Sequence, residues 1–285
     1  MRIWEKTAAV VVLAAPLVCA PVWAAVQSDA AQDGTAQSSP AKNGNQNGDA
    51  QSGARNAEAS KNDSQITEEA QKKLKGSNFS GVQARAENGI IHLTGTVKVY
   101  ADKQEAEKKV EKVKNAVSVV NDIQVAGGES NDQQIADKIA RQLAYDRVGY
   151  GNVFNAITVS VNQGVVTLGG HALGPVAKNS ALNLAKHTPG VQDVVDHIQV
   201  DPPSPIDNEL RERVARAVYG YPSLNKYAIN PANPIRITVV NGRVILSGVV
   251  DSQADKNVAG IQANTVPGVF SVTNNIEVAG SEERR

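Results

Sequence analysis

Apolar residues recur along this chain first at helical spacing and then at strand spacing, and the same succession returns further on. Ile66, Ala70 and Leu74 are spaced for one face of a helix, and Val82 to Ala86 alternates apolar and polar residues as a half-buried strand does. Asn88-Gly89 follows, a dipeptide that tolerates the positive φ values of a two-residue hairpin turn. A strand returning antiparallel to the first is therefore expected after it.

A second helix is expected from about Ala101 to Lys114, and a last strand from Val117 to Val125. One face of this helix is apolar, while interleaved Lys and Glu residues solvate the opposite face. The apolar face is formed by Ala106, Val110, Val113 and Val117. Asn115 aligns with Gly190 and Gly268 further along the chain, which predicts a left-handed residue that ends the helix.

The return strand carries a signature that occurs three times in the chain. In each copy a turn glycine lies four residues before a leucine, and a second glycine lies two residues after that leucine. The nine residues are Gly89, Leu93, Gly95, Gly164, Leu168, Gly170, Gly242, Leu246 and Gly248. The second glycine of each copy is equally distant from a closing valine, Val125, Val200 or Val278, so the chain is a tandem array.

Each copy predicts the element order α-β-β-α-β. The hairpin makes its two strands antiparallel, and the helical crossover allows the last strand to run parallel to the second. The predicted fold class is α+β, with three tandem small domains, each a three-stranded mixed sheet with two helices. The predicted domain bounds are residues 63–127, 131–201 and 206–280.

The region before the first domain predicts export. Residues 1–24 have a weakly basic start, an apolar run and a small-residue site after Ala24, which is typical of a cleaved signal peptide; a retained anchor is the alternative. Residues 25–62 are rich in Gln, Ser, Asn and Gly and are expected to be a disordered linker. Cleavage would remove Cys19, the single cysteine, and with it disulfides and thiol catalysis. The expected location is periplasmic or secreted.

Net charge and the absence of catalytic motifs argue against several classes of function. The 29 basic and 29 acidic residues cancel, which argues against a nucleic-acid partner. No histidine pair has metal-ligand spacing on a helix, and no hydrolase or phosphate-loop motif occurs, so we expect no catalytic residue, no metal and no cofactor. The histidines are His92, His171, His187 and His197. Asp102, Asp251 and Asp255 lie near helix starts, where a capping role is the simpler interpretation.

The second and third copies carry insertions between their first helix and the hairpin, near residues 146–155 and 219–234. Most aromatic residues that follow the predicted signal peptide lie in or beside these two insertions. One interpretation is that these rings cover an open end of each small core. The other is a contact surface, whose predicted members are Tyr150, Phe154, Tyr221 and Tyr227.

The third copy, with Asn-Gly-Arg-Val-Ile-Leu-Ser-Gly at Asn241–Gly248 and the closing run Gly268–Val278, resembles the BON domain (bacterial OsmY and nodulation). The first copy departs from the pattern at Asn115, and the second at Gly169 and Asp196. The resemblance implies an exported, non-enzymatic protein that binds phospholipid or the cell envelope, with a role in osmotic or envelope stress. The alternative is a periplasmic protein-interaction or chaperone-like protein that holds other envelope proteins. The signature residues are fold residues and locate no ligand.

Overall fold

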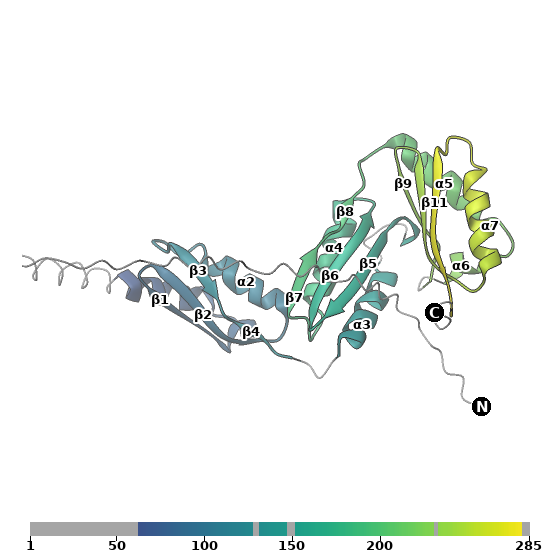
Figure 1. The fold of residues 1–285 in the computed structure, drawn as a ribbon. Coiled ribbons are helices and arrows are strands. Elements are labelled where there is room, and N and C mark those ends of the chain that lie inside the picture. Colours follow the sequence, from purple (N-terminus) through teal and green to yellow (C-terminus); the bar gives the residue numbers. More distant parts are fainter. Residues whose placement is uncertain (1–61, 128–130, 147–151, 231–232, 281–285) are drawn as a thin grey trace, which may run out of the picture.

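In the computed structural model the described residues are 62–127, 131–146, 152–230 and 233–280. The predicted signal peptide, the linker up to residue 61, and Tyr150 lie outside them. Within the described part, three α+β units follow one another along the chain (Figure 1). The predicted class of three tandem α+β domains is therefore confirmed.

The three repeats contain the following elements. Repeat one has a helix over residues 62–73, the 3-10 turn η1 (Ser77–Phe79), β1 (Val82–Glu87), β2 (Ile90–Val97), α2 (Tyr100–Val110), β3 (Ser118–Asn121) and β4 (Gln124–Val125). Repeat two has α3 (Asp132–Ala144), η2 (Asn152–Phe154), β5 (Ala156–Asn162), β6 (Val165–Ala172), α4 (Pro175–Lys186), β7 (Asp193–Asp196) and β8 (Gln199–Val200). Repeat three has α5 (Pro205–Tyr219), α6 (Lys226–Ile229), β9 (Arg236–Val240), β10 (Arg243–Val250), α7 (Gln253–Asn264) and β11 (Ser271–Val278).

Each sheet has the predicted mixed topology, with the return strand in the centre. The hairpin pairs β1–β2, β5–β6 and β9–β10 are antiparallel, and the strand after the crossover helix pairs parallel to the return strand. In repeats one and two this last strand is divided, so the strand expected over Val117 to Val125 is observed as β3 and β4. In repeat three β11 is continuous and pairs with β10 from Arg243↔Ser271 to Val250↔Val278.

Each repeat has its own apolar core between the helices and one face of the sheet. In β1 buried and exposed residues alternate, which leaves the second face of this sheet outside the core. The signature leucines Leu93, Leu168 and Leu246 are fully buried in their respective cores. Val117 is the exception among the positions expected to be apolar and buried, since it is 80% exposed. The physical reason is that α2 ends at Val110, well before the predicted end, and Val117 lies beyond the chain reversal at Asn115.

Backbone geometry explains why the signature requires glycine. The turn residues Asn88 and Gly89 have φ values of 53° and 78°, as a type I′ hairpin turn requires. At the second glycine position the strands approach too closely for a side chain: a Cβ on Gly95 would lie 2.0 Å from the Gly81 carbonyl oxygen. A Cβ on Gly170 would lie 2.0 Å from the Ala156 carbonyl oxygen. Asn115 has φ of 64°, which confirms the left-handed residue after the helix.

Candidate functional site

Tyr227, predicted to belong to a contact surface, is instead part of the core of repeat three. It is 5% exposed, and its hydroxyl donates to the Asp255 carboxylate at 2.9 Å and accepts from the Asp251 backbone N–H at 2.8 Å. Burial raises the pKa of the Tyr227 phenol above its ordinary value. The short helix α6 folds this ring over the end of the core, so for this residue the lid interpretation applies.

Phe154 also covers a core, but that of the next repeat. It lies on η2 in the insertion of repeat two and packs against the core of repeat three. Beside it, Arg236 of β9 donates to the Asn155 carbonyl oxygen at 2.8 Å, and burial lowers the pKa of this guanidinium. Of the four predicted surface residues, Tyr221 alone is described as exposed, at 40%, and Tyr150 lies outside the described residues. Two of the three described residues, Phe154 and Tyr227, therefore pack in the core of repeat three and do not form an exposed contact surface.

A buried ion pair joins repeats two and three. Asp201, which directly follows the last strand of repeat two, is 3% exposed and accepts from Nη2 of Arg211 on α5 at 3.0 Å. The other oxygen of Asp201 lies 2.9 Å from Nδ1 of His171. Because both partners are buried, neither charge is solvated if the other is removed. His171 thus lies at an inter-repeat junction.

The junction between repeats one and two combines an aromatic ring with polar contacts. Tyr100, at the start of α2, packs against the cores of both repeats. Burial is the largest cause, and a hydrogen bond to the Asp193 carboxylate the second, of a rise in the pKa of Tyr100 to about 12. Gln192 adds a long hydrogen bond of 3.4 Å from Nε2 to the Val125 carbonyl oxygen. At this junction repeat two contributes Gln192 and Asp193, which lie beside its hairpin turn.

Three aspartates, which the sequence patterns did not select, each hold a hairpin turn. Asp207 accepts from the backbone N–H groups of Asn241 at 3.0 Å and Gly242 at 2.9 Å. Asp63 and Asp132 make the same pair of bonds to the turns of repeats one and two. Burial alone would raise the pKa of Asp207, but these hydrogen bonds outweigh it and the pKa lies below the ordinary value.

A second repeated contact explains why repeat two departs from the family pattern at Asp196. In repeat three, Asn274 accepts from the Ile276 N–H and donates to the Lys256 carbonyl oxygen. Asp196 accepts from the Ile198 N–H at 3.0 Å but has no amide donor. The Lys178 ammonium instead lies 2.8 Å from the second carboxylate oxygen and donates to the Ile198 carbonyl oxygen, so an ion pair joins α4 to this strand. The departure is therefore a compensated structural change.

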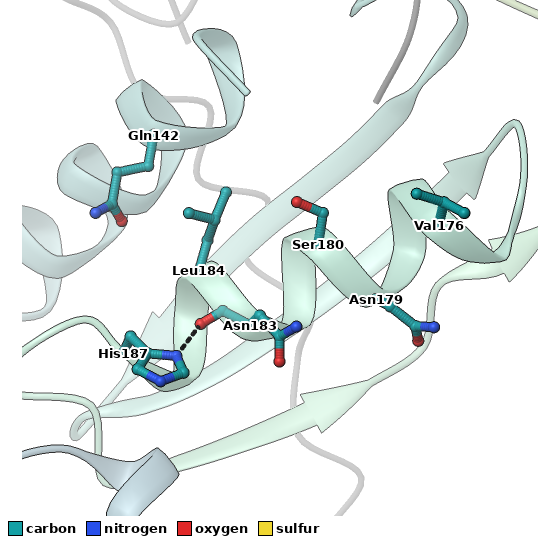
Figure 2. A pocket seen from close by; sticks show the side chains of 7 residues that line it. All are labelled: Gln142, Val176, Asn179, Ser180, Asn183, Leu184 and His187. Atoms are coloured by element: carbon teal, nitrogen blue, oxygen red, sulfur yellow. Dashed lines mark hydrogen bonds between the residues drawn. The ribbon is translucent and has the colours of Figure 1, made fainter. Parts of the chain in front are cut away.

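A groove of about 520 Å³ lies between α3 and α4 of repeat two (Figure 2). It is lined by Gln142, Val176, Asn179, Ser180, Asn183, Leu184 and His187. Ser180 donates to Asp146 at 2.7 Å, and Nδ1 of His187 lies 2.8 Å from the Asn183 carbonyl oxygen, so the two side chains engage different partners. Across the described ranges no three His, Cys, Asp or Glu residues are grouped to hold a metal ion. Nor does any helix there have the length and apolarity to cross a membrane.

Large apolar side chains are exposed at the end of repeat three that carries its hairpin turn. Phe270 is 73% exposed, and the Arg243 guanidinium lies 4.7 Å from the centre of its ring. Ile206 is 75% exposed and precedes Asp207, which holds the turn. Neither apolar residue was predicted as a contact residue, because the aromatic insertions drew the prediction to another part of the repeat.

These features define a class: a tandem array of small α+β modules that dock on one another and whose repeated polar contacts maintain the fold. The chain belongs to the BON-domain family, since the BON domain model matches residues 62–127, 131–202 and 207–280. The resemblance inferred from the signature residues is thereby confirmed, and so is the number of copies.

Relatives are similar over part of the chain. Osmotically-inducible protein Y of Escherichia coli (strain K12) is 29% identical over 163 residues, which are 53% of this chain and 74% of that protein. The "Uncharacterized protein in gshII 5'region" of Anaplasma centrale is 28% identical over 126 residues, 43% of this chain and 83% of that protein. The chain is thus a BON-domain protein similar to an osmotically inducible one.

Among solved structures, the C-terminal domain of CdsD, the structural protein of the type III secretion system of Chlamydia trachomatis, is 16% identical. The match covers 75% of this chain and 96% of that one at a TM-score of 0.21, which is too low to support any argument.

Proposed function

We propose that this protein is an exported, non-enzymatic component of the cell envelope that binds phospholipid surfaces and acts under osmotic or envelope stress. Membership of the BON family and similarity to an osmotically inducible protein support the stress role. The leader pattern of residues 1–24 supports export to the periplasm or beyond the cell.

The observation that carries the proposal is the exposure of large apolar side chains on every repeat. Val117 of repeat one is 80% exposed, Val176 of repeat two 61% and Phe270 of repeat three 73%. Single exposed apolar residues are common on soluble proteins, and each would add little affinity alone. Because the modules are linked, weak contacts of repeats one and two add a small increment to a main contact made by repeat three.

Vesicle co-sedimentation of the full chain tests this function. We expect the protein to sediment with vesicles that contain phosphatidylglycerol, and to do so less strongly as salt is raised, because part of the attraction is electrostatic. A protein that stays in the supernatant with anionic vesicles at low salt would contradict the proposal.

A second candidate is a protein that holds other envelope proteins. Exposed tyrosines favour it, since Tyr145 is 65% and Tyr221 40% exposed, and tyrosine is enriched where proteins contact one another. Suppression of the heat aggregation of an unrelated periplasmic protein, together with absence of vesicle binding, would favour this function instead.

A further inference from the structure

One position beside the hairpin turn is structurally equivalent in the three repeats but differs in chemistry. The backbone N–H of Val117 donates to the carbonyl oxygen of the turn glycine at 2.8 Å. Gln192 and Phe270 make the same bond to their turn glycines at 2.9 and 2.8 Å. Since the backbone contact is the same, the three side chains project from corresponding positions of their repeats. The differences between them therefore reflect what each repeat meets there.

In repeat two this position is used within the chain. Gln192 bonds to the Val125 carbonyl oxygen of repeat one, and its neighbour Asp193 bonds to Tyr100. A polar residue suits a junction between polar backbone groups. In repeats one and three the position is apolar and exposed, so Val117 and Phe270 are available to a partner outside the chain.

Repeat three combines the exposed ring with positive charge. Arg243 lies over the Phe270 ring, and Nη2 of Arg213 lies 3.4 Å from where a Cβ on Gly268 would be. Nε of Arg213 is buried without a hydrogen-bond partner among the described residues. Repeat one has Ile90 at the position that corresponds to Arg243, so its Val117 has no such cation.

The two buried carboxylates at this end engage partners other than Arg213 and Arg243. Asp207 is 5% exposed and its two oxygens accept from the hairpin turn. Asp201 is buried and paired with Arg211. Glu209 is exposed on α5, roughly one helical turn from Ile206. This end of repeat three thus offers two exposed apolar side chains, Ile206 and Phe270, with the Arg243 guanidinium over the Phe270 ring and Arg213 beside Gly268.

We propose that this hairpin end, formed by Ile206, Arg213, Arg243 and Phe270, is the surface by which the protein enters the headgroup region of an anionic phospholipid membrane. The Phe270 ring and the Ile206 side chain enter the boundary between headgroups and acyl chains, as the apolar faces of interfacial segments do. The Arg243 guanidinium exchanges its place over the ring for a lipid phosphate, which its planar donors match in geometry. This assignment rests on the proposed phospholipid binding and specifies its site.

The test uses the full chain and vesicles of phosphatidylcholine with or without phosphatidylglycerol. Phe270→Ser should weaken binding to anionic vesicles about tenfold, since a ring that loses interfacial burial forfeits an apolar contact of this order. Val117→Ser, which changes the equivalent position of repeat one, is the matched control and should stay within about twofold of the unchanged protein. Arg243→Gln should weaken binding to anionic vesicles and leave the weak binding to neutral vesicles unchanged. Unaltered thermal unfolding of all three variants verifies the fold.

The possible outcomes separate the site from the function. Absence of vesicle binding by the unchanged protein overturns both the function and the site. Binding that Phe270→Ser and Val117→Ser reduce equally, or not at all, overturns the site and leaves phospholipid binding standing. Loss of binding to a protein client, with vesicle binding intact in Phe270→Ser, would assign this end to a protein partner and also overturn the proposal.

Discussion

Removal of the Asp207 carboxylate should destabilise repeat three selectively. In Asp207→Ala the hairpin turn loses two charge-assisted hydrogen bonds, of 3.0 Å from the Asn241 N–H and 2.9 Å from the Gly242 N–H. Each such bond contributes about 1.5–3 kcal/mol, but the freed N–H groups lie at a surface turn where water can replace part of it. We therefore expect a loss of about 2–3 kcal/mol from the free energy of unfolding of repeat three. Asp63→Ala, at a less buried site, should cost repeat one about 1 kcal/mol.

Urea titration followed by hydrogen–deuterium exchange resolves the three repeats, because peptides from each report its own unfolding. Glu209→Ala, which changes an exposed residue of the same helix, is the control and should shift the midpoint by little. If Asp207→Ala left the midpoint of repeat three within error of Glu209→Ala, the turn-holding role of the aspartates would be refuted.

The pH dependence of this contribution has a definite sign. The folded pKa of Asp207 lies below its ordinary value, so folding favours the ionised carboxylate. Its stabilisation is fully present above the unfolded pKa of about 3.9 and is lost as the pH falls through the lower, folded pKa. Asp207→Ala should therefore remove part of the acid sensitivity of repeat three while leaving its stability profile near neutrality flat.

Further substitutions test the junction, the close strand approach and the buried phenol. Arg211→Met should weaken the contact between repeats two and three and lower the free energy of unfolding by about 3–5 kcal/mol, because it leaves the Asp201 carboxylate buried without its cation. Small-angle scattering should show a larger radius of gyration, and an unchanged scattering profile would contradict this. Gly170→Ala should cost more than about 3 kcal/mol through strain, whereas Gly127→Ala, where a Cβ meets nothing within 4 Å, should be nearly neutral in thermal unfolding. Tyr227→Phe should lower the free energy of unfolding by about 1–2 kcal/mol, and a purely surface role would predict no change.

The repeated units could be predicted from the sequence because their determinants are local. Apolar spacing and the Asn-Gly turn specify helices and strands within a few residues, and the equal spacing of the closing valines reveals the tandem order. The turn-holding aspartates were also available to sequence reasoning. Asp63, Asp132 and Asp207 each lie three residues before the first core residue of the first helix of their repeat, and this regularity was overlooked.

The candidate site could not be predicted in the same way, since it depends on which apolar residues remain uncovered. Tyr227 and Phe270 are both aromatic residues of repeat three, but α6 carries Tyr227 into the core, while the reversal at Gly268 leaves Phe270 outside it. The Asp201–Arg211 pair joins residues of different repeats, whose burial follows from docking. No local pattern distinguishes such a pair from an exposed one.

Hydrogen–deuterium exchange of the full chain with and without phosphatidylglycerol vesicles tests the central claim most directly, because it maps the membrane contact without altering the protein. The account predicts slower exchange on vesicles in peptides around the hairpin turn of repeat three, Asn241–Arg243, and around Gly268–Phe270. The corresponding turn of repeat one, Asn88–Ile90, should exchange as it does in solution. Protection confined to the α3–α4 groove of repeat two, or spread evenly over all three repeats, would contradict it.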